Sequence, residues 1–351
     1  MSPATDDLQQ SFRTHANYLR AFARLAGFEY WPAQDGKTLE KLAQSVVTAF
    51  PRTATPPPAD REEMAKCLNR AWGTELLLNL GARFEEDELV RLSNSWGSVQ
   101  TYYVGYAATQ ALIVAEGRAR PTTHPKTQDQ GGTLWVTRQA SVAPFSFAAK
   151  AGSKTNPIAY ANGPGRSIDM AVHSWKACDA NNCWDIAATA LRTTREDAVK
   201  KRYQDLRIKK ARDIKKAWED EEQTRLGQGK KARKRPDFPA TSNLAPSEKA
   251  AAEAKVRPYT MLDYLFRLRI KANYEEARMF TEEPDSESIS SLVALDMVRI
   301  ASATMIAHEA RIAQLLGKNA ISDIADDWIK TNSPPARMGI RRRLPILRGV
   351  L

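Results

Sequence analysis

The uncharged stretch SVQTYYVGYAATQALIVAE, from Ser98 to Glu116, decides the fold class of this chain. Its first charged residue is the final Glu116, and Gly117 follows as a helix stop. A helix without a polar face has to be covered by protein on all sides. The stretch therefore predicts a long helix at the centre of a core.

Helical patterns on both sides of this stretch supply the rest of such a core. Apolar residues recur every three or four positions in 1–50, 60–126 and 259–330, which is the spacing of helices that bury one face. The segment 51–59 contains four prolines and predicts a stiff linker. We therefore expect an all-α protein with an N-terminal helical hairpin, a Pro-rich linker and a helical bundle built from two halves.

The segment 127–258 interrupts this pattern and predicts a large, partly irregular insertion. It opens with Gly and Pro turn signals around a short expected strand at 133–136. A long basic helix is expected over about 184–226, because apolar residues again recur at helical spacing until two glycines break the pattern. The segment 230–258 is rich in proline and charge, and we expect it to be mobile.

Composition limits the classes of protein that this chain can belong to. The 351 residues are 42% hydrophobic, which suffices for a sizeable core. Three cysteines are too few for a disulfide scaffold and predict reduced thiols. The polar start differs from a secretory signal, and there is no run of eighteen apolar residues. We therefore expect a cytoplasmic protein that does not cross a membrane.

Positive charge is concentrated in one segment of the chain. The net charge is +11, and residues 192–236 hold 17 Lys and Arg against 8 Asp and Glu. A second cluster lies in an expected basic tail, 331–351. Clustered cations attract polyanions and release counterions on binding, whereas a solvated helix face is the alternative interpretation. The side chains expected to contact nucleic acid are Lys200, Lys201, Arg202, Arg207, Lys209, Lys210, Lys215, Lys216, Lys230, Lys231, Arg233, Lys234, Arg235, Arg341, Arg342 and Arg343.

Histidines and cysteines offer few sites for metal chemistry. His15 and His308 lie on apolar helical faces, where a hydrogen-bonded core role is expected. His173, Cys178 and Cys183 are evenly spaced but lack the paired Cys-x-x-Cys units of a zinc site. We therefore expect neither a bound metal nor a cofactor.

Two separated segments resemble the HEPN superfamily of small helical domains. The first is the aromatic stretch 102–113, which Gly117 and then His124 follow. The second is LRIKANY, residues 268–274, before the last long helix. Asn273 stands where Asp is more usual in the family. The resemblance covers about a third of the chain.

This resemblance implies a fold in which 60–126 and 259–316 form one split bundle. Catalytic HEPN members are metal-independent ribonucleases in which four to six residues separate an Arg from a His, usually at a dimer interface. The imidazole moves a proton, and the guanidinium stabilises the charge of the phosphorane. Two pairs match this spacing and are the candidate catalytic residues: Arg118 with His124, and Arg166 with His173.

The resemblance also implies a role in a prokaryotic defence or toxin system. In the family a polar residue usually follows the Arg. Ser167 after Arg166 fits this pattern better than Ala119 after Arg118 does. The pair Arg166 and His173, however, lies in the expected insertion. Because inactive HEPN-like proteins serve as binding or assembly modules, the resemblance does not decide whether this chain is catalytic. The expected partner is nucleic acid, and RNA is expected in preference to DNA. A homodimer, or an adaptor that docks a partner protein, is the alternative.

Overall fold

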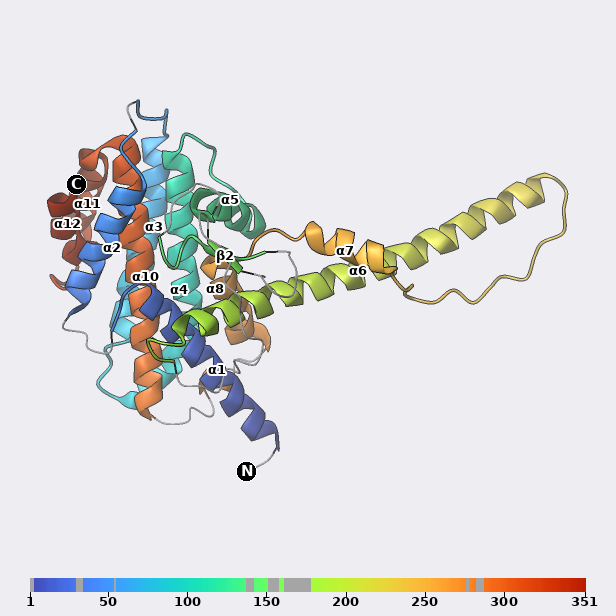
Figure 1. The fold of residues 1–351 in the computed structure, drawn as a ribbon, viewed down its shortest axis with the longest axis horizontal. Helices are drawn as coiled ribbons and strands as arrows, with labels where there is room; N and C mark the ends of the chain where they lie inside the picture. Colours follow the sequence, from blue (N-terminus) through green and yellow to red (C-terminus); the bar gives the residue numbers. More distant parts are fainter. Residues whose placement is uncertain are drawn as a thin grey trace. The chain divides into compact units, whose positions relative to one another are not determined.

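The computed structural model confirms an all-α fold (Figure 1). The residues that it describes are 3–29, 34–53, 55–136, 142–150, 158–160, 178–275, 278–281 and 287–351. Within them, two short strands pair antiparallel, with Ala148 opposite Ala159. The helices and strands of this described part are α1 (Pro3–Leu25), α2 (Asp35–Ala49), α3 (Arg61–Gly81), α4 (Asp87–Ala115), α5 (His124–Val136), β1 (Phe147–Ala149), β2 (Ile158–Tyr160), α6 (Cys183–Gly227), α7 (Pro246–Ala254), α8 (Met261–Ile270), a π-helical turn (Lys271–Glu275), α9 (Arg278–Thr281), α10 (Glu287–Leu316), α11 (Lys318–Asn332) and α12 (Gly339–Val350).

The chain forms two compact units. The main unit contains Met1–Arg192 and Tyr259–Leu351, and the basic unit contains Thr193–Pro258. The end of the basic unit coincides with the expected end of the insertion at residue 258. Its start lies well after the expected boundary at residue 127, because α5, β1 and β2 belong to the main unit.

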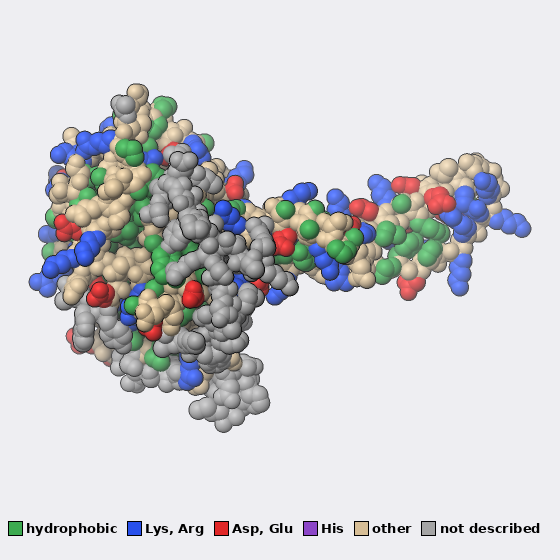
Figure 2. Space-filling view, in the orientation of Figure 1, with side chains coloured by type: hydrophobic (Ala, Val, Ile, Leu, Met, Phe, Trp, Pro, Cys, Tyr) green, Lys and Arg blue, Asp and Glu red, His purple; other side chains and the backbone are tan. Residues whose placement is uncertain are grey.

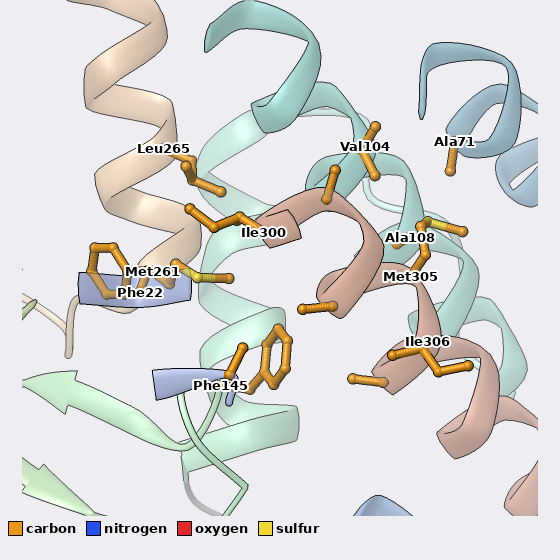
Figure 3. Close-up of a cluster of buried hydrophobic side chains, with 14 of the residues drawn as sticks. Phe22, Ala71, Val104, Ala108, Phe145, Met261, Leu265, Ile300, Met305 and Ile306 are labelled. Atoms are coloured by element: carbon orange, nitrogen blue, oxygen red, sulfur yellow. The ribbon is translucent and has the colours of Figure 1, made fainter. Parts of the chain in front are cut away.

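Helix α4 is the central helix of the main unit, as the uncharged stretch predicts. From Thr101 to Ala115 it is buried except at Tyr103, and it packs against α3, α8 and α10. In Figure 3, Ala108 of α4 lies beside Met305 of α10. The two expected halves of the bundle therefore share one core, because α3 and α4 come from the first half and α8 and α10 from the second.

Helix α5 replaces the strand that we expected at 133–136. Two glycines were interpreted as a turn, but both lie inside this helix. A Cβ atom at Gly131 would lie 2.8 Å from the Thr109 methyl carbon of α4. Glycine is therefore needed at this position because two helices approach closely, and the turn interpretation was wrong.

Both ends of the chain also pack differently from our expectation. The N-terminal helices α1 and α2 each pack against α10 rather than mainly against each other. The expected basic tail contains helix α12, which packs against α2, α3, α10 and α11. The reason is its apolar face, on which Ile340, Leu344 and Leu347 are buried.

A buried network of charges fixes α12 to the core. Arg343 donates to both carboxylate oxygens of Glu309 at 2.8 and 2.9 Å, and it also pairs with Glu75. Trp72 Nε1 donates to Glu309 Oε1 at 2.8 Å, and the Ser302 hydroxyl donates to Glu75 Oε1 at 2.9 Å. Burial raises the pKa of Glu75. Arg343 is therefore a core cation with no access to nucleic acid, and our expectation for it was wrong.

Helix α10 is long and apolar enough to span a bilayer by length and composition. Its stretch Ile289–Leu316 has a mean hydropathy of 1.5, although the sequence contains no unbroken apolar run. In this structure 67% of the qualifying window is buried inside the protein. A core helix meets the same criterion, and α10 packs against α1, α2, α3 and α4.

The basic unit is a helix with a return segment beside it. The chain reverses after Gly227, where Gly229 has a φ of 71°. The Arg233 amide donates to Glu222 of α6 at 2.6 Å, and the Ser242 amide donates to the Arg207 carbonyl at 3.0 Å. The segment 230–258, which we expected to be mobile, therefore follows α6 back and contains α7.

Replacing Arg343 with Ala is expected to destabilise the fold by about 3–5 kcal/mol, because two buried carboxylates lose their cation. The matched control is Arg341→Ala two residues away. Arg341 is exposed and donates only to the Pro334 carbonyl, so we expect about 1 kcal/mol or less. Urea unfolding measures both free energies. Equal effects of the two substitutions would contradict the role of the network.

Candidate functional site

The basic unit carries most of the excess charge of the chain. It holds 19 Lys and Arg against 11 Asp and Glu, a net charge of +8 out of +11 for the whole chain. Figure 2 shows Lys and Arg side chains gathered at the end of this unit where the chain reverses. The basic unit is therefore the first candidate for a nucleic-acid interface.

Part of this charge is neutralised within the basic unit. Several cations that we expected to contact nucleic acid pair with carboxylates instead. Lys210 bonds Glu248 at 2.8 Å, and Arg235 bonds Glu219 at 3.0 Å. Arg233 pairs with Glu221 at 2.9 Å and Glu222 at 2.6 Å, and Lys215 lies 3.9 Å from Glu219. Lys210, Arg233 and Arg235 join α6 to the return segment, whereas Lys215 and Glu219 both lie in α6. At all four side chains a phosphate would have to compete with a carboxylate.

A set of exposed lysines remains without such partners. In the described part of the chain, seven expected contact residues are exposed and form no ion pair: Lys200, Lys201, Lys209, Lys216, Lys230, Lys231 and Lys234. Arg202 and Arg207 are half-buried, and Arg207 donates to the Thr241 hydroxyl at 3.4 Å. The free charge of the basic unit is therefore carried mainly by lysine.

A groove of about 350 Å³ lies between α6 and α7 within the basic unit. Arg202, Lys209, Lys210 and Lys255 line it, with Asp213 and Glu248 as the opposing charges. Lys255 was missed in the sequence because it lies outside the densest run of cations. An excess of cations along a groove of this size suits a phosphate group.

The C-terminal arginines offer less accessible positive charge than the sequence suggested. Arg343 is buried, as described above. Arg341 is exposed but donates to the Pro334 carbonyl at 2.7 Å, and Arg342 is half-buried. These side chains belong to a packed helix rather than to a free basic tail.

His124 lies in a second candidate site, which we call the aromatic–histidine cluster: Tyr102, Tyr103, Tyr106, His124, Phe266 and Arg269. His124 is the first residue of α5, and its Nδ1 is 2.7 Å from the Tyr102 hydroxyl. Its ring centroid is 4.7 Å from that of Tyr106 and 5.5 Å from that of Phe266. In the described part of the chain, Nε2 of His124 has no hydrogen-bond partner.

Arg269 is the arginine that the fold brings to His124. Its guanidinium carbon lies 5.0 Å from the Phe266 ring centroid, and Nη1 donates to the Tyr103 hydroxyl at 3.1 Å. Burial and the charge of Arg269 lower the pKa of His124. Both effects favour the neutral imidazole.

The expected partner of His124 was Arg118, and the structure gives no contact between them. Arg118 is exposed just beyond the end of α4, and no interaction joins it to His124 among the described residues. Spacing along the chain could not identify Arg269, which is distant in sequence. The signal was present in the second family-like segment, where Arg269 follows Leu268. Arg166 and His173 lie outside the described residues.

His15 and His308 are core residues, as their apolar faces predict. His15 Nδ1 is 3.2 Å from the buried Tyr264 hydroxyl. His308 Nδ1 is 2.7 Å from the Thr304 carbonyl, which can only accept, so Nδ1 carries the proton. Nε2 then accepts from Trp135 Nε1 at 3.3 Å. Burial lowers the pKa of His308 to about 4.

Two members of the evenly spaced set of His and Cys, Cys178 and Cys183, lie in the described part of the chain. Among the described residues, no group of three His, Cys, Asp or Glu side chains could hold a metal ion. Burial raises the pKa of the Cys178 thiol to about 12, so this thiol stays protonated and is a poor ligand. His173, the third member of the spacing considered above, lies outside the described residues.

The buried imidazole of His308 predicts a pH dependence of stability. Because its folded-state pKa is about 4 and its unfolded value is about 6.5, the unfolded state binds more protons between these pH values. The free energy of unfolding is therefore expected to fall by about 3 kcal/mol as pH falls from 6.5 to 4. Urea unfolding of His308→Gln should show this pH dependence reduced. If wild type and variant differed in the free energy of unfolding by the same amount at both pH values, the prediction would be wrong.

No protein-family model, curated protein or solved structure matches this chain.

Proposed function

We propose that the protein binds nucleic acid through the basic unit. The observation that carries this proposal is the set of seven exposed lysines that remain after the internal ion pairs are formed. They belong to a unit with a net charge of +8 and only a small buried core. Its cations therefore stay in water, where phosphates can replace their counterions.

The binding mode follows from the kind of cation that remains free. Lysine ammonium groups act as point charges and contact phosphates without reading base edges. The groove between α6 and α7 offers Arg202, Lys209 and Lys255 to the same backbone. We therefore expect binding that is strong at low salt and shows little sequence preference. The family resemblance favours RNA over DNA as the ligand.

Neutralising four free lysines should weaken the binding of RNA and should make that binding less sensitive to salt. In the variant Lys200→Gln, Lys201→Gln, Lys209→Gln and Lys216→Gln, the slope of log Kd against log salt for a labelled single-stranded RNA should fall by up to about 3. Fluorescence anisotropy across a salt titration measures it. Unlabelled DNA of the same sequence, used as competitor, tests the preference for RNA.

A matched control removes the same charge from the main unit. Lys37, Lys41, Lys318 and Lys330 are exposed there, and their replacement by Gln should leave the slope within error. Equal losses in the two variants would show that only net charge matters and would refute the proposal. Salt-insensitive binding of a protein partner, without binding of nucleic acid, would support the adaptor alternative.

The aromatic–histidine cluster favours a second function, phosphodiester cleavage in RNA. In the tautomer whose Nδ1–H donates to the Tyr102 hydroxyl, the neutral imidazole of His124 can accept the proton of a 2′-hydroxyl at Nε2. That oxygen then attacks phosphorus, the 5′-oxygen leaves with a proton from water, and a cyclic phosphate remains. Arg269, held beside His124 by three aromatic rings, would stabilise the charge on the phosphorane.

Cleavage of labelled RNA in EDTA tests this second function. His124→Gln should reduce the cleavage rate by at least about 100-fold, because proton transfer is lost. Arg269→Lys should also reduce the cleavage rate. Arg118→Gln is the matched control and should retain wild-type activity, since Arg118 lies outside the cluster. Cleavage that depends on Arg118 and tolerates His124→Gln would contradict this assignment.

A further inference from the structure

The tip of the α3–α4 hairpin exposes a concentration of large apolar side chains. Of nine exposed large hydrophobic residues in the described part of the chain, six lie between residues 77 and 96. Their exposed fractions range from 42% to 65%. These six residues form what we call the apolar face: Leu77, Leu80, Phe84, Leu89, Leu92 and Trp96.

The apolar face is one continuous surface rather than six scattered residues. Leu77, Leu80 and Phe84 are spaced by three and four positions, and so are Leu89, Leu92 and Trp96. Leu77 and Leu80 therefore share one side of α3, and Leu89, Leu92 and Trp96 share one side of α4. Phe84 is exposed in the turn that follows α3. The two helices are in direct contact, since the Ser93 hydroxyl donates to the Gly81 carbonyl at 3.1 Å. The two rows consequently run side by side on the outside of the hairpin.

The apolar face is as large as the largest apolar patches that monomers ordinarily expose. Four Leu, one Phe and one Trp at these exposures present on the order of 600 Å² of apolar area, the upper end of the largest patch on typical monomers. A standard protein interface buries about 800 Å² per partner. With its polar rim, the face is therefore large enough for one side of a stable dimer.

The charges around the apolar face complement a second copy of the same hairpin. Arg70 lies seven positions before Leu77 on the same side of α3 and is exposed. Glu85 and Glu86 are exposed at the opposite end, where the hairpin turns, and they outnumber the exposed Arg83 there. An antiparallel pair of hairpins related by a two-fold axis places Arg70 of each copy against Glu85 and Glu86 of the other. The same pairing sets apolar residues against apolar residues.

We propose that the apolar face is a homodimer interface, with the two α3–α4 hairpins packed antiparallel. Gly73 supports close approach, because a Cβ atom there would meet nothing within 4 Å and the position lies on the same side of α3. Tyr103 continues the row of α4 seven positions after Trp96. The interface therefore reaches the edge of the aromatic–histidine cluster, but it depends on neither proposed function.

Introducing a charge into the apolar face should separate the dimer. Wild-type full-length chain, freed of nucleic acid, should sediment at twice its monomer mass at micromolar concentration. Leu80→Glu should raise the dimer Kd by at least about 30-fold. Leu226→Glu is the matched control, since Leu226 is exposed to 49% against 45% for Leu80 but lies in the basic unit. It should leave the dimer intact.

A charge exchange then distinguishes a second copy from any other partner. Arg70→Glu in one chain and Glu85→Lys with Glu86→Lys in another should each weaken self-association, because like charges meet. Mixing the two variants should restore a dimer, since both contacts then join opposite charges. A monomeric wild-type chain, a dimer that survives Leu80→Glu in a folded variant, or a failure of the mixture to associate would each overturn the proposal. Circular dichroism establishes that the variants fold.

Discussion

The close packing of α4 against α10 is the constraint on which the main unit depends. Alanines at the contact allow the helices to approach, and Ala107, Ala108 and Ala307 are fully buried. Such a contact excludes water, so polar groups buried in it are stabilised by partners inside the protein. Thr109 donates to the Gly105 carbonyl, and His308 donates to the Thr304 carbonyl. The same packing that stabilises the core therefore makes His308 unsuitable for chemistry.

Whether a cation can act on a ligand depends on what surrounds it. Arg343 is enclosed by the core and pairs with Glu75 and Glu309, and Arg299 is likewise buried beside Asp35 at 3.0 Å. These charges are tolerated because each is paired, and removing one partner is costly. The basic unit has too little apolar surface to enclose its lysines, so they remain hydrated and able to exchange counterions for phosphates.

The two candidate sites rely on different physics. The role proposed for the basic unit depends on summed charge, which is long-ranged and weakened by salt. The role proposed for the aromatic–histidine cluster depends on local geometry, because three tyrosines and Phe266 pack around His124 and Arg269. The proposed binding and cleavage of a polyanion would use both properties. The exposed apolar face of α3 and α4 adds the surface that we propose as a homodimer interface.

The sequence by itself determined the helical class, the central position of 98–116 and the segment that carries the charge, because these follow from local periodicity and composition. Tertiary structure decided which charges are free: Arg341 and Arg343 are two residues apart, yet only the packing of α12 buries the second. It also decided that Gly131 serves a helix contact and that Arg269, not Arg118, lies beside His124. Such pairings join residues far apart in the chain, so spacing along the sequence carries no information about them.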